Sequence, residues 1–245
     1  MNRYSTLSQL KAIAREQLFG KYLPLSSTYL ILYLLRNFVT APAALLTMPS
    51  PFGHIAYYVI EWAITLFFAI FQVGISYIFL SNACEQRPMT GNLYIGFTMG
   101  PLKAISIWLI PSLLLALPTF IPNIALSLIL ELKGQRLLCA LAVWICIVLP
   151  LCSLICLLTR LPYALCFYIM LDFPDMEAKA CRCYSVKLMK GNKWRYFKLQ
   201  LSFIPFYILS FFTFGIGMLY ILPYKAHTTA NFYLDLMQVQ DTPAI

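Results

Sequence analysis

The sequence has few charged side chains. Only 9 of its 245 residues are acidic and 18 are basic, a charged share of 11% against roughly 25% in an ordinary soluble domain. Hydrophobic residues make up 61% of the chain, against roughly 45–50% in soluble domains. So few charges cannot cover a soluble fold, which excludes a soluble globular protein and predicts a surface that mostly faces lipid. The 15 prolines and the 16% aromatic content exclude a long coiled coil and a polar disordered chain.

The chain also lacks the sequence patterns of membrane enzymes. It has no His-Glu-x-x-His pair for zinc, no Gly-x-Ser-x-Gly turn for a nucleophilic serine and no Gly-rich phosphate loop with lysine. It has only two histidines, and few carboxylates, Glu61 among them, lie inside the predicted spans, so acid and base pairs are scarce. We therefore expect a protein that is not an enzyme, with no catalytic residues and no cofactor.

The cysteines do not form a metal-binding pattern. Five of the eight lie in or beside one predicted span: Cys139, Cys146, Cys152, Cys156 and Cys166. Cys152 and Cys156 share a helix face, but no histidine or carboxylate lies in that span. Cys181 and Cys183 are separated by one residue, whereas a redox or zinc pair needs two. We expect no metal site and interpret these cysteines as small apolar residues.

Long uncharged stretches dominate the rest. A helix that crosses a membrane needs about 20 apolar residues, and 62–84, 104–130, 137–159 and 199–224 contain no Asp, Glu, Lys or Arg. A fifth stretch, from about 22 to 48, is interrupted only by Arg36. Because these runs lack strict alternation, they can satisfy their backbone hydrogen bonds in lipid only as helices.

The sequence thus predicts an all-α fold, a polytopic membrane helical bundle of about six transmembrane helices plus cytoplasmic interfacial helices. Residues 1–245 would form a single transmembrane domain. The expected spans are about 22–48, 57–84, 101–130, 137–171, 198–214 and 216–237.

The last uncharged stretch can be read as one span or two. Pro205, the glycines at 215 and 217, and Pro223 interrupt it, and a moderately apolar segment follows to about Met237. One span to 222 gives five helices in total; a turn at 215–217 followed by a return span gives six. We prefer six, because the segment after Tyr224 carries few charges for an exposed tail.

The distribution of lysine and arginine predicts the orientation, since cytoplasmic segments near span ends are enriched in both. Three segments, before the first span, after the second and after the fourth, would share one side of the membrane. Their basic residues are Arg3, Lys11, Arg15, Lys21, Arg87, Lys103, Lys179, Arg182, Lys187, Lys190, Lys193, Arg195 and Lys198. The opposite side has Lys133 and Arg136. We therefore expect a multi-pass cell-membrane protein with a cytoplasmic N-terminus and, with six spans, a cytoplasmic C-terminus.

Residues 1–21 form a predicted cytoplasmic amphipathic leader, with a helix over 5–20. Thr6 and Gln9 have the spacing of a capping box, and Gly20 can end the helix. Its apolar stripe consists of Leu7, Leu10, Ala14 and Leu18. We expect this stripe to lie against the acyl boundary of the membrane; the alternative is a solvated leader that frays.

A basic cytoplasmic helix is predicted within 172–197. Asp172 can cap it, Pro174 lies in its first turn and Gly191 can stop it. Candidate residues for binding anionic lipid headgroups are Lys179, Arg182, Lys187, Lys190, Lys193, Trp194, Arg195 and Lys198. The simpler alternative is a generic membrane anchor. Because the positive charge borders membrane spans, we expect membrane lipids as partners, with a partner membrane protein as a further option, and no nucleic acid.

Ionisable groups inside a membrane are costly and tend to have a partner or a task. Arg36 would lie about 22 Å into the bilayer at 1.5 Å per residue from Lys21, where Glu61 can approach it. A return span would bring further polar groups toward them. The predicted intramembrane polar cluster is Arg36, Glu61, Lys225, His227 and Asn231, completed by an anionic ligand or lipid headgroup. The alternative is that Arg36 snorkels outward and Lys225 lies at the interface.

Motifs at both ends of the chain, covering roughly 40% of it, resemble a known family. They read AREQLFGK at 14–21, LMKGNK at 188–193 after Ser185, LSFI at 201–204, TFGIG at 213–217, PY at 223–224 and ANFY at 230–233. The chain resembles the bacterial integral membrane family catalogued as domain of unknown function 975. It departs from the family pattern at Pro205 and Phe206, where a Gly-Trp pair is usual. The resemblance implies a plasma-membrane protein of Gram-positive type with no assigned activity and no known catalytic residues, and it supports the return span.

Two function classes fit this sequence. The preferred one is a non-enzymatic multi-span module that binds lipid, a peptide or a partner membrane protein. The alternative is a small-solute or lipid transporter, since prolines at 111, 118, 122, 150 and 162 should kink or break two spans. A binding module predicts basic interfacial patches and few intramembrane charges, whereas a transporter predicts ionisable residues that face a polar cavity.

Overall fold

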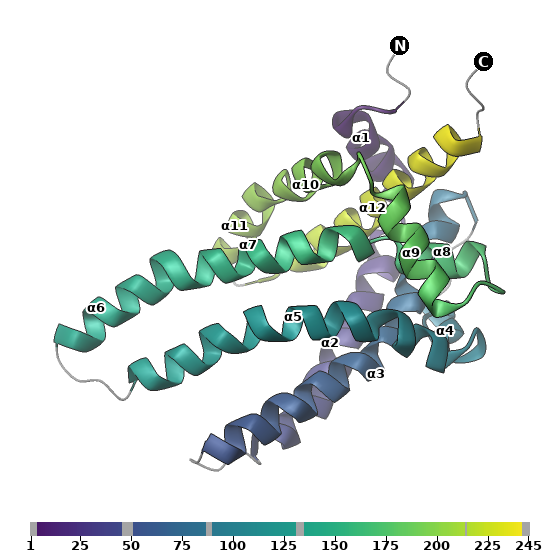
Figure 1. Ribbon diagram of the computed structural model, residues 1–245. Helices are drawn as coiled ribbons and strands as arrows, with labels where there is room; N and C mark the ends of the chain where they lie inside the picture. Colours follow the sequence, from purple (N-terminus) through teal and green to yellow (C-terminus); the bar gives the residue numbers. More distant parts are fainter. Residues whose placement is uncertain (1–3, 46–50, 87–89, 131–134, 214, 242–245) are drawn as a thin grey trace.

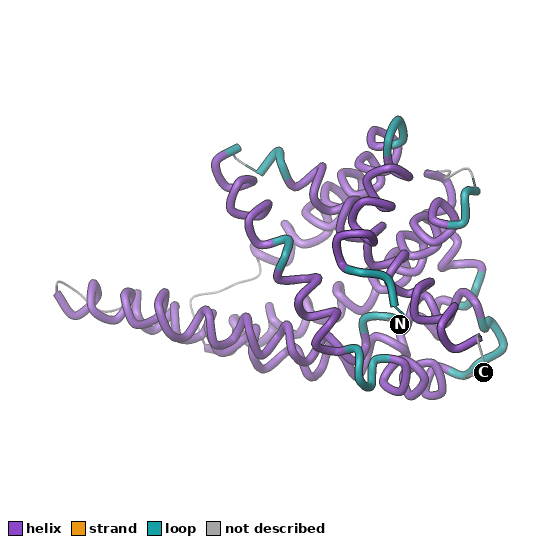
Figure 2. Tube along the Cα trace, turned by 90° about the horizontal axis from the view of Figure 1, so that it is seen from above, coloured by secondary structure: helices purple, strands orange, loops and turns teal. Residues whose placement is uncertain are grey.

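A computed structural model describes residues 4–45, 51–86, 90–130, 135–213 and 215–241. Over these residues the chain consists of helices joined by short loops and has no strand (Figures 1 and 2). The predicted all-α class is therefore confirmed. The predicted span ends at 46–48 and 214, and the basic residues Arg3, Arg87 and Lys133, lie outside the described residues.

The helices follow one another in three groups. The first comprises α1 (Leu7–Leu18), α2 (Tyr22–Leu45), α3 (Pro51–Ala83), η1 (Thr90–Tyr94) and α4 (Ile95–Thr98). The second comprises α5 (Pro101–Leu130), α6 (Gln135–Val143), the π-helical turn η2 (Trp144–Val148), α7 (Leu149–Arg160), η3 (Leu161–Tyr163) and α8 (Cys166–Asp172). The third comprises α9 (Ala178–Leu188), α10 (Lys193–Leu201), α11 (Ile204–Phe212) and α12 (Met218–Asp241).

Several of these helices are long and apolar enough to cross a membrane. Ala56–Ala83 and the helical run Arg136–Asp172 meet this criterion alone. Two bent pairs meet it together: Leu7–Leu18 with Tyr22–Pro42, which meet at 96°, and Gly91–Thr98 with Pro101–Ala116, which meet at 89°. Length and composition thus give two such helices, or up to four in the described residues, and the count of six remains a prediction.

The prolines have different effects in the two helices they were expected to interrupt. α5 continues through Pro111, Pro118 and Pro122 without a break. Pro150 follows the π-helical turn at the start of α7, and Pro162 lies in η3. The Trp144 indole N–H donates to the Pro122 carbonyl oxygen at 2.8 Å, which ties α5 to the adjacent helix.

The capping box at the start of α1 is confirmed. Thr6 Oγ1 accepts from the Gln9 backbone N–H at 3.3 Å, and Gln9 Oε1 accepts from the Thr6 backbone N–H at 2.8 Å. Gly20, with φ +75°, lies in the turn between α1 and α2.

The apolar stripe of α1 faces the protein. Leu10, Ala14 and Leu18 are at most 2% exposed, and α1 packs against α12. The prediction that this stripe lies against lipid is therefore wrong, because α12 covers it. Lys11 Nζ donates to the Ser202 carbonyl oxygen at 3.1 Å, and burial, with a smaller effect of Arg15, lowers the pKa of Lys11.

Two glycines allow η1 and α4 to lie directly on α3. A Cβ on Gly74 would stand 2.0 Å from the Leu93 carbonyl oxygen, and one on Gly96 would stand 2.1 Å from the Ile70 carbonyl oxygen. Both distances are too short for any side chain. This close backbone contact fixes the point at which the chain turns into α5.

The segment predicted as one basic helix over 172–197 contains the last residue of α8, all of α9 and the start of α10. Asp172 ends α8 and lies too far before the next helix to cap it; its Oδ2 accepts a hydrogen bond from the Tyr233 hydroxyl at 2.5 Å. α9 begins only at Ala178, after Glu177 as its N-cap. The chain turns at Gly191, with φ +87°, before α10 starts.

The chain reverses direction between α11 and α12. Gly215, with φ +85°, donates its N–H to the Ser210 carbonyl oxygen at 2.9 Å. α12 then runs back to the end of the molecule that holds α1, α8, α9 and α10 (Figure 1). The predicted turn at 215–217 therefore exists, and the helix that follows it reaches Asp241.

Candidate functional site

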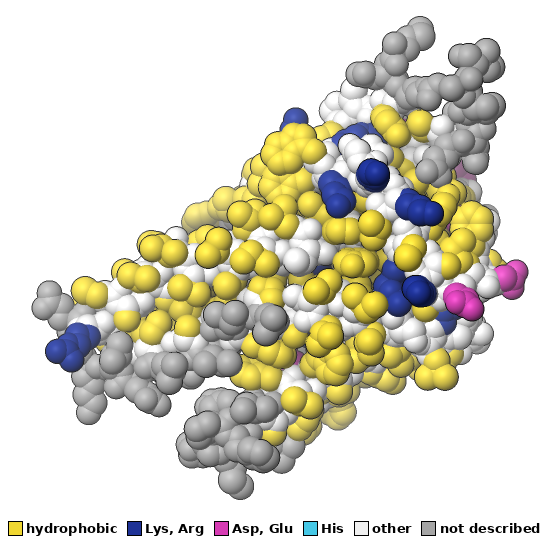
Figure 3. Space-filling model, in the orientation of Figure 1, with side chains coloured by type: hydrophobic (Ala, Val, Ile, Leu, Met, Phe, Trp, Pro, Cys, Tyr) yellow, Lys and Arg dark blue, Asp and Glu magenta, His cyan; other side chains and the backbone are white. Residues whose placement is uncertain are grey.

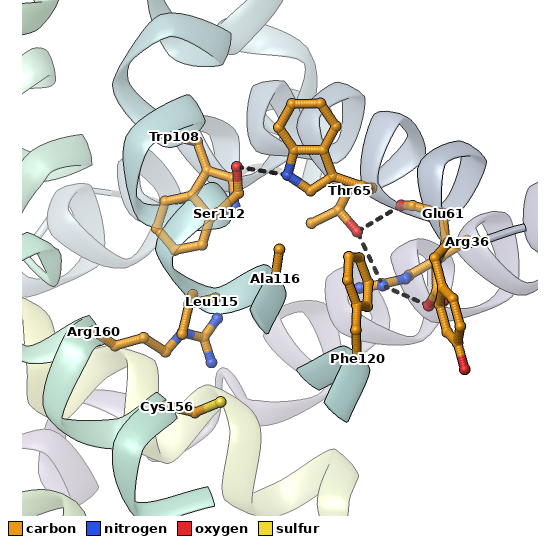
Figure 4. Close-up of a pocket in the computed structure, with 12 residues that line it drawn as sticks. Arg36, Glu61, Thr65, Trp108, Ser112, Leu115, Ala116, Phe120, Cys156 and Arg160 are labelled. Atoms are coloured by element: carbon orange, nitrogen blue, oxygen red, sulfur yellow. Dashed lines mark hydrogen bonds and ion pairs between the residues drawn. The ribbon is translucent and has the colours of Figure 1, made fainter. Parts of the chain in front are cut away.

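A polar pocket of about 320 Å³ lies among α2, α3, α5 and α7 (Figure 4). Its lining combines three charged side chains with aromatic, small and apolar ones. The lining residues are Arg36, Tyr58, Glu61, Trp62, Thr65, Trp108, Ser112, Leu115, Ala116, Phe120, Cys156 and Arg160. Because these residues come from helices far apart in sequence, only the folded arrangement creates the pocket.

Arg36 and Glu61 form a loose ion pair on one side of the pocket. Arg36 Nη2 lies 3.9 Å from Glu61 Oε1 and 3.5 Å from Thr65 Oγ1. The Thr65 hydroxyl donates to the Glu61 backbone carbonyl one helical turn earlier, at 2.9 Å. The Arg36 side chain remains 47% exposed, so several of its five N–H donors are available to a ligand.

Arg160, at the end of α7, lies across the pocket from this pair (Figure 4). Its guanidinium carbon is 5.7 Å from the centroid of the Trp108 ring, a cation–π distance. Within the described part of the chain it forms no ion pair and no hydrogen bond.

Trp62 and Trp108 line the pocket between the two arginines and connect the helices that form it. The Trp62 indole N–H donates to Ser112 Oγ at 3.2 Å, which joins α3 to α5. Trp108 also packs on Phe167 of α8, with ring centroids 5.6 Å apart. The pocket thus contains two arginines and one glutamate, so one positive charge is in excess, and its geometry suits an anion.

Sequence reasoning missed Arg160 as a site residue, although it lies inside the predicted span 137–171. The uncharged run used to locate that span ends at 159. A charge eleven residues before the predicted end of a span was the signal that could have identified it.

Of the predicted polar cluster, the structure brings together Arg36 and Glu61 but places the other three elsewhere. Lys225 lies over the Tyr207 ring at 5.5 Å and is not among the pocket residues. His227 Nε2 is 3.3 Å from Asn82 Nδ2, and Asn231 Nδ2 donates to Gln17 Oε1 at 3.1 Å. The five residues therefore do not form one site, because α12 directs His227 and Asn231 toward the end of α3 and α1, and Lys225 toward α11.

His227 and Asn231 belong to a second, buried polar network near the ends of α1 and α3. Lys21 Nζ donates to Asn82 Oδ1 at 2.8 Å, and Gln17 Nε2 donates to the Ala83 carbonyl oxygen at 3.2 Å. His227 and Asn82 are at most 1% exposed. Because the network joins α1, α3 and α12, its evident role is to hold these helices together.

The candidate headgroup-binding residues divide into two groups. Arg182 donates to the Ser106 carbonyl oxygen, and Arg195 forms an ion pair with Asp235 at 2.6 Å, so both serve internal contacts. Five lysines and Trp194 are exposed: Lys179, Lys187, Lys190, Lys193 and Lys198. Dark-blue side chains gather over α9 and the start of α10 in Figure 3, whereas the surface over α6 and α7 is mainly yellow.

Metal chemistry has no evident ligand set in the described residues. Among those residues, no three His, Cys, Asp or Glu side chains lie close enough together to hold a metal ion. Cys181 is buried, and burial raises the pKa of its thiol.

Together these features define an all-α protein with several helices long and apolar enough to cross a membrane and a polar, cation-rich pocket between them. The model of the family described as "Protein of unknown function (DUF975)" matches residues 1–240. The chain therefore belongs to this family, and the match includes the middle of the sequence, where no motif was recognised. No curated protein and no solved structure matches the chain.

Proposed function

We propose that the chain is a non-enzymatic, multi-pass cell-membrane protein that binds an anionic amphiphile in the pocket among α2, α3, α5 and α7. The observation that carries this proposal is the excess of cations there: Arg36 and Arg160 face one carboxylate, Glu61. A singly charged phosphate-bearing headgroup would neutralise the excess and accept hydrogen bonds from both guanidinium groups.

Membrane insertion is supported by the large apolar side chains exposed along the helices. Leu138 of α6 is 68% exposed and Phe211 of α11 is 82% exposed, and only 6% of the most apolar window in Arg136–Asp172 is buried. Contiguous apolar surface of this kind is stable only against lipid or another protein. With the basic segments on one side, the proposed topology has both termini in the cytoplasm.

The lining of the pocket also supports an amphiphile over a fully hydrated anion. Leu115, Ala116 and Phe120 lie beside the charged groups, so an acyl chain could remain in apolar surroundings while the headgroup contacts the arginines. The single carboxylate is engaged with Arg36, and the lining contains no histidine and no second carboxylate for general acid–base chemistry.

Native mass spectrometry of the purified protein tests this proposal. Anionic phosphatidylglycerol should remain bound at collision energies that remove zwitterionic phosphatidylcholine. The Arg160→Gln variant should retain less phosphatidylglycerol than the wild-type protein at these energies, whereas Arg136→Gln, which removes an exposed arginine outside this pocket, should retain as much as the wild type. Equal retention of both lipids by the wild-type protein would refute the proposal.

A transporter for a small anionic solute or a lipid is the second candidate. The observation that favours it is the pocket itself, because ionisable residues that face a polar cavity between helices are typical of transporters. Transport assays in proteoliposomes distinguish the two functions. If the protein only binds its ligand, the proteoliposomes should show no protein-dependent lipid exchange between leaflets and no anion uptake. Uptake that Arg160→Gln abolishes would establish transport instead.

A further inference from the structure

The outward face of α10 combines lysines with exposed apolar side chains. Lys193, Trp194, Lys198 and Leu201 are exposed on this face, and the half-buried Phe197 shares their helical spacing. Trp194 is 64% exposed and Leu201 is 46% exposed. Trp194 stacks on Phe197 with ring centroids 5.1 Å apart, and Lys198 Nζ lies 5.5 Å from the Trp194 ring.

The opposite face of α10 is fully used inside the protein. Tyr196, Leu199 and Gln200 are buried. Arg195 is held by Asp235 at 2.6 Å and by the Ser5 carbonyl oxygen at 2.6 Å. The internal contacts fix the rotation of α10 about its axis, so the outward face is presented as a rigid unit.

The position of this face along the chain separates a basic surface from an apolar one. Before α10, the exposed residues include Lys187 and Lys190 at the end of α9. After it, the large exposed side chains of α11 are all apolar: Ile204, Phe206, Ile208, Leu209, Phe211 and Phe212. A helix at such a boundary, with aromatic residues in the centre of its face and lysines on the flanks, suits the interface between headgroups and acyl chains.

We infer that the outward face of α10 lies in the headgroup layer of an anionic leaflet, where Trp194, Phe197 and Leu201 enter the acyl boundary and Lys193 and Lys198 bind anionic phospholipid headgroups. Nucleic acid or an acidic peptide would match the lysines, but neither accounts for the apolar centre or for its continuation into α11. The assignment narrows the predicted set of headgroup-binding residues to those on the outward face of α10. It does not depend on the pocket.

Fluorescence quenching of the full chain in nanodiscs tests this inference. The discs contain mainly phosphatidylcholine with some phosphatidylglycerol, and either lipid carries brominated acyl chains. The Trp194 signal is the difference between the wild-type protein and Trp194→Phe, which separates it from the other tryptophans. We expect brominated phosphatidylglycerol to quench this signal more strongly than brominated phosphatidylcholine at equal mole fraction.

Matched lysine variants test the role of charge. Lys193→Gln with Lys198→Gln should lower the preference for phosphatidylglycerol severalfold, because each lysine near a charged surface contributes up to about fivefold. Lys179→Gln with Lys187→Gln removes the same charge from α9 and should change the preference much less. Arg160→Gln should leave Trp194 quenching unchanged, so failure here is distinguishable from failure of the pocket proposal.

Two results would overturn the inference. If the Trp194 signal is quenched by aqueous iodide and not by brominated lipids, the face is in water or against another protein. If both brominated lipids quench equally and the α10 lysine variant has no effect, the face is an apolar anchor that does not recognise headgroup charge.

Discussion

Arg195 of α10 and Asp235 of α12 form an ion pair of 2.6 Å that also holds the start of the described chain. Asp235 Oδ1 accepts from the Ser5 backbone N–H at 2.9 Å, and the Arg195 guanidinium lies 4.9 Å from both the Tyr4 and Phe232 ring centroids. The two side chains are only 18% and 8% exposed. This arginine therefore organises three segments, although the sequence places it in a row of surface cations.

Replacing Arg195 with Gln should strongly destabilise the protein, because it leaves the Asp235 carboxylate buried without its partner. Removing one partner of a buried pair costs about 3–5 kcal/mol, whereas Lys198→Gln, an exposed cation on the same helix, should change stability by less than about 0.5 kcal/mol. Thermal unfolding in detergent compares the two variants. Equal melting temperatures would show that the ion pair does not form.

The contact between α3 and the η1–α4 segment should tolerate no side chain. Gly74→Ala would place a methyl group 2.0 Å from the Leu93 carbonyl oxygen, so the helices must separate, and overpacking of this kind costs about 1–3 kcal/mol. Gly91→Ala, also in this segment, has no atom within 4 Å of its Cβ and is the control. If both variants unfold at the same temperature, the close backbone contact is absent.

Two cysteines of α9, separated by one residue, should react very differently with a maleimide. Cys183 is exposed and Cys181 is buried, and burial also raises the pKa of Cys181, which keeps its thiol protonated. Mass spectrometry of the labelled full chain should show that Cys183→Ala loses one modified site and that Cys181→Ala loses none. The reverse pattern would mean that α9 is rotated by about half a turn.

The proposed topology predicts a cytoplasmic C-terminus. A reporter that is active only outside the cytoplasm should be silent when fused after residue 245 and active when inserted at 131–134, between α5 and α6. Strong exterior activity of the C-terminal fusion would indicate five crossings rather than six.

Local features of the fold could be predicted from the sequence because they depend on neighbouring residues. The capping box of Thr6 and Gln9, the all-α class and the chain reversal at 215–217 are of this kind. The partner of the α1 stripe could not be predicted, since an apolar face fits lipid and another helix equally well. Here α12, more than two hundred residues away, packs on α1, whose Leu10 and Ala14 are buried.

Only the part of the site that depends on depth along the chain could be predicted. Arg36 and Glu61 were paired by their depth in adjacent spans, and the structure places them 3.9 Å apart. The position of Lys225 depended on the rotation of α12, which hydropathy does not determine, and the helix directs His227 toward Asn82 instead. The charge of Arg160 inside a predicted span marked it as unusual, but its place in the pocket depends on the packing of α7 on α5, a tertiary contact that hydropathy does not determine.

The dependence of lipid affinity on the charge of the pocket decides whether Arg36 and Arg160 form an anion-binding site. The dissociation constant of a short-chain phosphatidylglycerol is determined by titration calorimetry for wild type, Arg160→Gln and Glu61→Gln. Arg160→Gln should weaken binding about tenfold or more, since a hydrogen bond to a charged group contributes about 1.5–3 kcal/mol. Glu61→Gln should strengthen it, because the competing carboxylate is removed. The same dissociation constant in all three proteins would contradict the account.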